Sequence, residues 1–215
     1  IRDSSTSRGL GDVYKRHQFM SAKIRHALPS DIPAAARTLA LAFESYPWTR
    51  RSIPRDNYQQ RLYRLQYIYL THAVTNGFVL ISGKSDGVAA ALPPKCPGLE
   101  KAQQSEVADL MESRFTTISQ IKLPKQPADA WTSATLGVHP TRAGHGLGTA
   151  LIEECLSHVS RSSTPRIGLE TSTKRNVDLY RRQGFKLVHK THVEKELIVY
   201  SMFLDMQANT LGENR

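Results

Sequence analysis

The fold of this chain is decided by the stretch Thr135-Leu-Gly-Val-His-Pro-Thr-Arg-Ala-Gly-His-Gly-Leu-Gly-Thr-Ala-Leu151. It opens with β-branched and apolar residues, passes through a proline turn and a glycine-rich loop, and continues as an amphipathic helical pattern. Glycines at 144, 146 and 148 let successive backbone N–H groups face an anion at the positive end of the helix. The pattern predicts a phosphate-binding loop. A tight strand-to-helix turn without a ligand is the alternative that glycines alone leave open.

Two common nucleotide-binding loops do not fit this stretch. A dinucleotide fingerprint needs a third glycine at position 149 or 151, where Thr149 and Leu151 stand. A nucleoside triphosphate loop needs a Gly-Lys-Ser/Thr ending, and the segment contains no lysine. The predicted anion is therefore neither NAD nor a nucleoside triphosphate.

Three further motifs follow in the C-terminal half. A short buried strand is predicted at Ile167-Gly-Leu-Glu-Thr-Ser172, and a short helix containing Asn176 and Tyr180 precedes the stop Gln183-Gly-Phe185. In order and spacing, these motifs and the loop resemble the GCN5-related N-acetyltransferase (GNAT) superfamily. Its acetyl-CoA loop, Gln/Arg-x-x-Gly-x-Gly/Ala, corresponds to Ala143-Gly-His-Gly146-Leu-Gly148. Its Asn-x-x-x-Tyr and Gly-Phe elements correspond to the later motifs.

The resemblance extends to the N-terminal half. The stretch Ile24-Arg-His-Ala-Leu-Pro-Ser-Asp-Ile-Pro33 is similar to the first strand and helix start of the superfamily. Within the superfamily, Ala36-Arg-Thr-Leu-Ala-Leu-Ala-Phe-Glu-Ser-Tyr-Pro47, the Leu-Glu-Thr-Ser segment and Ala134-Thr-Leu-Gly-Val138 look closest to puromycin N-acetyltransferase and its relatives. The likeness covers residues 23–205. In one departure, Ala143 stands where Gln or Arg is usual and Arg142 precedes it, so either Arg142 reaches the pyrophosphate or backbone amides bind it alone.

The resemblance implies an α/β fold with a mixed, mostly antiparallel sheet, a splayed central parallel strand pair and flanking helices. Hydrophobic periodicity and turn signals predict the individual elements. Strands are expected at 23–27, 78–82, 88–92, 131–138, 166–170, 186–194 and 197–204. Helices are expected from Ser30 or Asp31 to Pro47, at 58–75, at 105–120, after the glycine loop and at 174–180.

Length and composition favour one folded domain. The chain has 215 residues, of which 40% are hydrophobic, enough for a substantial single core. We expect a domain over 20–206, flanked by a disordered tail or expression remnant at 1–19 and a tail at 207–215. The net charge of +10 favours anionic partners, and the phosphates of coenzyme A suffice. Scattered basic residues without a nucleic-acid motif make nucleic acid an unlikely partner; a solvated basic surface is the plain alternative.

Cysteine usage and hydropathy bear on location. Cys96 and Cys155 are far apart and lack metal-ligand spacing, so neither a disulfide nor a metal site is expected. No apolar run approaches the roughly 20 residues that a membrane span requires. These features predict a cytoplasmic protein without a membrane partner, as a monomer or homodimer.

The resemblance also implies a cofactor site for acetyl-CoA (coenzyme A). The pantetheine arm would enter between strands 131–138 and 166–170, where unpaired backbone groups are available. For Asn176, helix capping is the alternative role. For His145 and the neighbouring His139, the alternative is a solvent-exposed position without a ligand. The expected cofactor-binding residues are Gly137, Val138, Arg142, Ala143, Gly144, His145, Gly146, Leu147, Gly148, Thr149, Asn176 and Tyr180.

Three residues are candidates for catalysis. Tyr180, by its place in the Asn-x-x-x-Tyr element, is the candidate acid for the departing thiolate, and packing on the sheet is its alternative role. The backbone N–H of Val138 is the candidate oxyanion donor. Glu170 ends the second splayed strand, where a carboxylate could bind the substrate ammonium and accept its proton; fixing the following turn is the alternative.

The acceptor pocket is expected after the first long helix. Phe43, Glu44, Tyr46 and Trp48, together with Glu170, combine aromatic rings with acids, which suits an amine that is partly apolar. The expected function is transfer of an acetyl group to a primary amine of a small molecule, puromycin-like or other, by direct attack in a ternary complex, with antibiotic resistance as a possible role. The alternatives are protein or peptide N-acetylation and a non-catalytic module that binds coenzyme A or nucleic acid.

Overall fold

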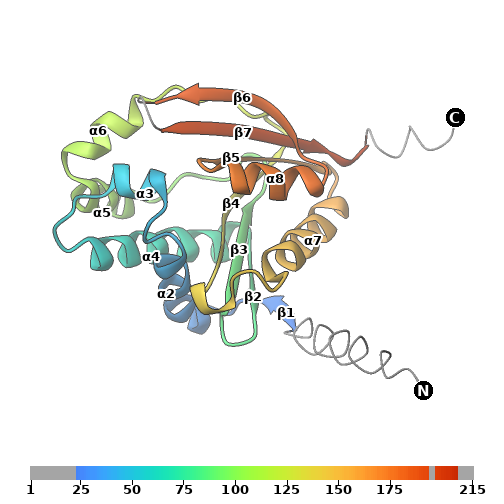
Figure 1. The fold of residues 1–215 in the computed structure, drawn as a ribbon, viewed down its shortest axis with the longest axis horizontal. Helices are drawn as coiled ribbons and strands as arrows, with labels where there is room; N and C mark the ends of the chain where they lie inside the picture. Colours follow the sequence, from blue (N-terminus) through green and yellow to red (C-terminus); the bar gives the residue numbers. More distant parts are fainter. Residues whose placement is uncertain (1–22, 194–196, 208–215) are drawn as a thin grey trace, which may run out of the picture.

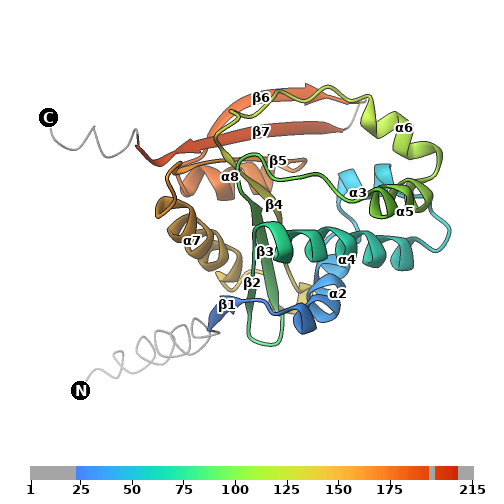
Figure 2. The same cartoon turned by 180° about the vertical axis from the view of Figure 1, so that it is seen from behind.

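A computed structural model describes residues 23–193 and 197–207 of the chain, and these form one seven-stranded sheet with helices on both faces (Figures 1 and 2). The predicted tail at 1–19 and nearly all of the tail at 207–215 lie outside the described residues. The strands are β1 (Ile24–His26), β2 (Phe78–Ser82), β3 (Gly87–Leu92), β4 (Trp131–Val138), β5 (Arg166–Thr171), β6 (Lys186–His192) and β7 (Ile198–Asp205).

The strand order is β1-β2-β3-β4-β5-β7-β6. Every neighbouring pair is antiparallel except β4 and β5, which are parallel and joined by a helix. This confirms the predicted mixed sheet with one central parallel pair. The helices are α2 (Ile32–Ala42), α3 (Pro47–Ser52), α4 (Tyr58–Asn76), α5 (Lys101–Met111), α6 (Ser113–Ser119), α7 (Leu147–Ser160) and α8 (Lys174–Arg182), with 3₁₀ turns at Pro29–Asp31 and Pro140–Arg142.

The two faces of the sheet carry separate apolar layers. Side chains alternate across a strand, so β2 sends Phe78 and Leu80 to one face and Val79 and Ile81 to the other. The first pair packs with residues of α7 and α8, and the second pair packs with α2 and α4. Because both faces are covered, all five residues of β2 are buried. The central strands are thereby fixed between two helical layers.

The parallel pair separates soon after it begins. β4 and β5 pair at Trp131 with Ile167 and at Thr132 with Gly168, although both strands continue beyond these positions. On its other edge, β4 shifts register against β3, so that Ala134 is an extra residue between Ser133 and Thr135. A bulge bends the strand that carries it. We infer that the bulge directs the second half of β4 away from β5, which produces the predicted splay.

Two helix boundaries differ from the sequence expectation. The helix expected at 105–120 is instead two helices, α5 and α6, because Glu112 lies between them at φ 52°. Pro47 was expected to end the first long helix, but α2 ends at Ala42, and Pro47 occupies the first turn of α3. Proline is well suited to that place, since the first helical N–H has no partner within the helix. In both segments the apolar residues keep helical spacing, although the backbone leaves the helix partway along the segment.

Within residues 23–193 and 197–207, no helix has the length and apolar character needed to cross a bilayer.

The close approach of α2 to β4 gives a stability prediction. A Cβ at Gly137 would lie 2.7 Å from Leu39 Cδ2 and 3.1 Å from Ala42 Cβ, both on α2. Overpacking of this kind costs about 1–3 kcal/mol, so Gly137→Ala should lower the free energy of unfolding by that amount in urea titration. Gly98→Ala is the matched control, because a Cβ there meets no atom within 4 Å. Equal stability of the two variants would contradict the packing.

Candidate active site

The splay between β4 and β5 opens into a cleft of about 410 Å³. One wall consists of residues 132–136 of β4 and residues 169–172 at the end of β5. The opposite side comes from the connection after α2 and from α4, which lies across the same face of the sheet in Figure 1. The bulge that separates the strands thus also positions the walls of the cleft.

The structure brings together most of the residues predicted for catalysis and acceptor binding. The cleft is lined by Phe43, Tyr46, Trp48, Glu170 and Tyr180, and also by Asn176 from the predicted cofactor-binding residues. Val138, predicted as the oxyanion donor, is not part of this lining. Glu44 is outside the lining: its carboxylate accepts a hydrogen bond from Gln59 Nε2, and its carbonyl oxygen accepts one from Tyr58 Oη at 3.0 Å. Glu44 therefore stays a prediction without a place in the cleft.

Sequence reasoning missed the contribution of α4. Gln66, Tyr69 and His72 line the cleft, as does Leu123 from the segment before β4. The three helix residues follow the 3–4-residue spacing of one helix face. That spacing was a usable signal, because it places the polar side chains of Gln66 and His72 on the same face as Tyr69. For Leu123 no signal of this kind exists.

Tyr46 joins the two sides of the cleft. Its hydroxyl lies 2.9 Å from Thr171 Oγ1 and accepts a hydrogen bond from the backbone N–H of Ser172 at 2.7 Å. Thr171 Oγ1 also accepts a hydrogen bond from Asn176 Nδ2 at 3.1 Å. These contacts tie the connection after α2 to the end of β5 and the start of α8, and so limit how far the cleft can open.

Asn176 has a positioning contact rather than a capping one. Thr173 is the N-cap of α8, and its Oγ1 accepts the hydrogen bond from the backbone N–H of Asn176 at 3.3 Å. The side chain of Asn176 is thereby left for Thr171 and the cleft. The predicted alternative, helix capping by this side chain, is not what the structure shows.

Tyr180 lies at the inner end of the cleft, 8% exposed, with its ring edge-on to Phe185 at 5.4 Å between ring centroids. Burial, with smaller contributions from Tyr46 and Cys155, raises the pKa of its hydroxyl above the ordinary value. The phenol therefore keeps its proton at neutral pH. It can donate a hydrogen bond to an atom in the cleft.

Glu170 places a carboxylate at the same end of the sheet. Desolvation raises its pKa above the ordinary value, and a hydrogen bond from Gln126 Nε2 to Glu170 Oε1, at 3.4 Å, partly offsets that rise. Gln126 reaches this position over Gly168, where a Cβ would lie 2.2 Å from Gln126 Oε1. A carboxylate with a raised pKa is a better proton acceptor than an ordinary one.

The end of β4 leads toward the glycine loop. His139 N–H donates to Asp86 O at 2.8 Å, on the β3 side of the strand. Consecutive amides of a strand point to opposite edges, so Val138 N–H is directed away from β3, toward the side from which β5 has separated. Gly137 is buried, and its neighbour across the sheet is Val88. Val138, unlike Gly137, thus has an amide suited to a ligand in the splay.

The glycine loop has the backbone that an anion site requires. Gly144 and Gly146 have φ of 84° and 81°, values that favour glycine, and no atom lies within 4 Å of a Cβ built on either. Gly146 is the N-cap of α7, whose first-turn amides, on Leu147, Gly148 and Thr149, have no acceptor within the helix. The segment from residue 141 to Gly146 is exposed. These amides form a positive helix end open to solvent.

The side chains in and beside the glycine loop contact either the turn between β2 and β3 or the loop itself. Arg142 Nε lies 3.4 Å from Asp86 Oδ2, the residue whose carbonyl also accepts from His139 N–H. His139 Nδ1 lies 2.8 Å from Thr141 Oγ1, and His145 Nδ1 lies 3.3 Å from Arg142 O. Ala143 continues the 3₁₀ turn through a bond from its N–H to Pro140 O at 3.2 Å. Both histidines therefore contact the loop itself rather than the cleft.

A cysteine nucleophile does not fit this site. Neither cysteine of the chain lines the cleft. Cys155 is 5% exposed within the apolar layer on α7, and burial raises the pKa of its thiol to about 12. Such a thiol is inert at neutral pH. Cys96 Sγ lies 3.6 Å from Nε2 of His72, which lines the cleft, but burial raises the pKa of this thiol as well, so neither thiol is activated as a nucleophile.

A known protein family matches the segment of the chain that forms the splay and the glycine loop. Residues 115–187 match the family model described as "Acetyltransferase (GNAT) domain". This range includes β4, the glycine loop, α7, β5 and α8, which together build the splay and the anion site. The predicted resemblance is thereby confirmed at the level of a GNAT domain. The closer likeness to puromycin N-acetyltransferase stays a prediction.

Solved structures share the whole fold. A histone acetyltransferase HPA2 and related acetyltransferase from Corynebacterium glutamicum matches with a TM-score of 0.68 and 20% identity, over 84% of this chain and 94% of that one. An N-acetyltransferase from Staphylococcus aureus Mu50 matches with a TM-score of 0.57 and 14% identity, over 85% and 100%. YncA from Salmonella typhimurium, with its cofactor acetyl-CoA, matches with a TM-score of 0.50 and 16% identity, over 86% and 93%. The chain therefore shares the fold of these solved structures, and its residues 115–187 match a GNAT acetyltransferase domain.

Proposed function

We propose that this chain, with its GNAT domain and fold, transfers the acetyl group of acetyl-CoA to a primary amine of a small molecule by direct attack in a ternary complex. The observation that carries the proposal is the separation of β4 from β5 between an anion-binding helix end and a cleft that contains Glu170 and Tyr180. In this arrangement the helix end would bind the diphosphate of the cofactor, the gap between β4 and β5 would hold its pantetheine arm, and the cleft would hold the acceptor.

The residues present fit such a cofactor. The left-handed glycines of the loop leave room for phosphate oxygens beside the first-turn amides of α7. Beyond Thr132, the edge of β4 that faces β5 has no strand partner, so its backbone groups can bind the amides of the arm. Because Arg142 is paired with Asp86, we assign the diphosphate chiefly to backbone N–H groups. When bound, acetyl-CoA supplies the thioester carbonyl carbon to which the acceptor nitrogen bonds.

Glu170 is proposed to prepare the acceptor. As a carboxylate it binds the ammonium form of the amine and takes one proton on an Oε atom, directly or through water, which frees the nitrogen lone pair. Its raised pKa brings it closer to the pKa of the amine than an ordinary glutamate would be. The aromatic rings of Phe43, Tyr46 and Trp48 complete a surface suited to a cationic, partly apolar molecule.

Tyr180 and Val138 are proposed to stabilise developing negative charge. Val138 N–H faces the splay and can donate to the carbonyl oxygen. Tyr180 Oη can donate to the departing sulfur. Because the pKa of Tyr180 is raised, while a thiol has a pKa near 8.5, complete transfer of the phenolic proton is unfavourable. Tyr180 therefore acts mainly as a hydrogen-bond donor, and the leaving thiolate takes its proton from solvent.

The contacts of Tyr46 support a small acceptor over a protein chain. A peptide substrate needs a groove that is open along its length, whereas Tyr46 connects the two sides of this cleft through Thr171 and Ser172. Peptide N-acetylation is the second candidate function. Detoxification of an amine antibiotic is the biological role we propose for the small-molecule reaction.

A screen of acceptors tests the proposed function. Release of coenzyme A is followed with puromycin, polyamines, aminoglycosides and N-terminal peptides as acceptors. We expect turnover with at least one small amine and a kcat/KM for it at least tenfold above that for any peptide. Turnover confined to peptides would favour the second candidate, and no coenzyme release with any acceptor would refute both.

Replacement of Tyr180 tests its role at the sulfur. Tyr180→Phe removes the hydroxyl but keeps the ring against Phe185, so kcat should fall about 10²-fold with little change in the Kd for acetyl-CoA. Tyr200→Phe is the control, because Tyr200 is 6% exposed in the same apolar layer and does not line the cleft. Weaker acetyl-CoA binding with unchanged kcat would contradict the role.

The pH profile tests Glu170 as the base. The carboxylate is the active form, so kcat/KM should fall as pH drops through the raised pKa of Glu170, and Glu170→Gln should lower kcat/KM about 10²-fold and abolish this acid limb. Gln126→Leu removes the hydrogen bond that lowers the pKa of Glu170, so the acid limb should move to higher pH. Glu153→Gln, on the exposed face of α7, is the control. An unmoved limb in Gln126→Leu would exclude Glu170 as its source.

A further inference from the structure

A second cavity, of about 300 Å³, lies beside the cleft and has no part in the chemistry described so far. It is open to solvent on one side and is bordered by α3, the first half of α4, the end of α5 and α6, which lie together at one end of the molecule (Figures 1 and 2). Its lining residues are Trp48, Thr49, Ser52, Ile53, Leu62, Leu65, Gln66, Tyr69, Met111, Phe115, Ile118 and Ser119.

The lining of this cavity is mainly apolar, and its polar members, Thr49, Ser52, Gln66 and Ser119, are uncharged. None of the described residues that form it carries a charge. Two of its hydroxyl groups are already used, since Thr49 Oγ1 donates to Phe43 O and Ser52 Oγ donates to Trp48 O. Tyr69 and Phe115 are also 45% and 37% exposed, unusual for large apolar side chains, so the cavity is bordered by uncovered rings. Its chemistry suits an uncharged alkyl or aryl group.

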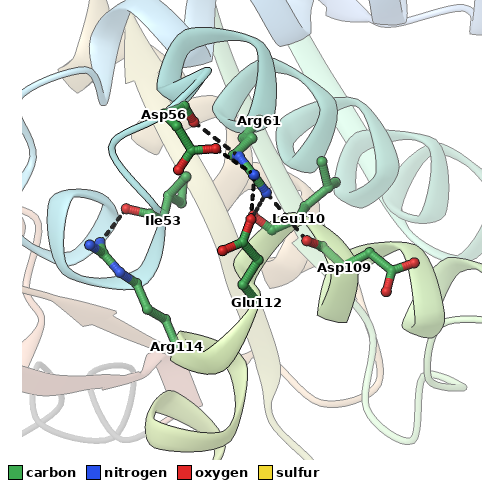
Figure 3. A network of polar contacts seen from close by, with 7 residues as sticks. All are labelled: Ile53, Asp56, Arg61, Asp109, Leu110, Glu112 and Arg114. Carbon is green, nitrogen blue, oxygen red and sulfur yellow. Dashed lines mark hydrogen bonds and ion pairs between the residues drawn. The ribbon is translucent and has the colours of Figure 1, made fainter.

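Polar contacts hold the outer wall of the cavity in place (Figure 3). Arg61 on α4 donates to Leu110 O at 3.0 Å and pairs with Asp56 and Glu112. Arg114 on α6 donates to Ile53 O at the end of α3. The two guanidinium groups thus fix α5 and α6 to α3 and α4 at the margins.

The cavity adjoins the cleft and shares four lining residues with it. Trp48, Thr49, Gln66 and Tyr69 line both spaces. The cleft contributes the carboxylate of Glu170, while the second cavity contributes only uncharged groups. A molecule that occupied both would present an amine to Glu170 and an apolar group to α6.

We propose that the second cavity is a subsite for the apolar tail of the acceptor, so that the preferred acceptors are amphipathic primary amines. This inference rests on the proposed function, because it places the reacting amine beside Glu170. The occupant is an alkyl or aryl group attached to the amine. It enters past Trp48 and Tyr69 and ends near Met111, Phe115 and Ile118.

A series of linear primary alkylamines from propylamine to nonylamine tests the subsite. With saturating acetyl-CoA, kcat/KM should rise about three- to fourfold for each added methylene that enters the cavity, and then level off when the cavity is full. Phe115→Ala removes a ring from the border and should reduce the rise per methylene at least twofold. Leu41→Ala is the control: Leu41 is 39% exposed on α2 and lines neither cavity, so the series should keep its slope.

A binding measurement separates this proposal from the proposed function. The chain has two tryptophans, so in a Trp131→Phe background the fluorescence of Trp48 reports on the shared wall. Octanol, which has the tail but no amine, should change this fluorescence with saturation, and Phe115→Ala should weaken its binding at least threefold. These results would support the subsite even if no amine were acetylated.

Three outcomes would overturn the subsite. Acetylation of all alkylamines at rates independent of chain length would leave the proposed function standing and remove the subsite. Octanol binding that is absent, or equally strong in Phe115→Ala, would remove it as well. Chain-length dependence that appears only among peptides with an apolar second residue would assign the cavity to a peptide side chain instead, contrary to the proposal.

Discussion

The structure depends on the interruption of hydrogen bonding between β4 and β5. Both strands lie in the middle of the sheet, where complete pairing is the rule, yet they pair at two positions and then diverge beside an extra residue, Ala134, in β4. The features of the proposed site are arranged around that divergence. The cleft fills the gap, Val138 N–H faces it, and Glu170 and Tyr180 border it. Rigid apolar layers on both faces keep the gap from closing.

The sequence predicts the strands well for a physical reason. β2, β3, β4 and β5 are short, rich in apolar or β-branched residues and bounded by turn residues, and these are local properties. One of the two helix boundaries that differ from the prediction involves a distant partner. Glu112 interrupts α5 and α6 with a left-handed backbone while its carboxylate pairs with Arg61, fifty-one positions away. No pattern within residues 105–120 contains that information.

The candidate site was predictable where a motif fixes a backbone. The glycine loop and the Asn-x-x-x-Tyr element have fixed spacings, so the places of Gly146, Asn176 and Tyr180 follow from the chain itself. Residues that reach the cleft through tertiary packing could not be predicted in this way. Gln126 meets Glu170 because Gly168 leaves room for it, and Gln66 and His72 enter because α4 crosses the splay. Glu44 shows the reverse case, a plausible acid whose partner is Gln59.

The turn between β2 and β3 contacts the start of the glycine loop, although the two segments are far apart in the sequence. Asp86 accepts the N–H of His139 through its carbonyl and holds Arg142 through its carboxylate. The second contact is a half-exposed ion pair of little energy, but the first is a backbone bond that does not vary with ionic strength or side-chain identity. The proposed anion-binding loop is therefore joined by a backbone bond to a hairpin some fifty residues upstream. A change in the length of that hairpin, rather than a change of its side chains, would displace the start of this loop.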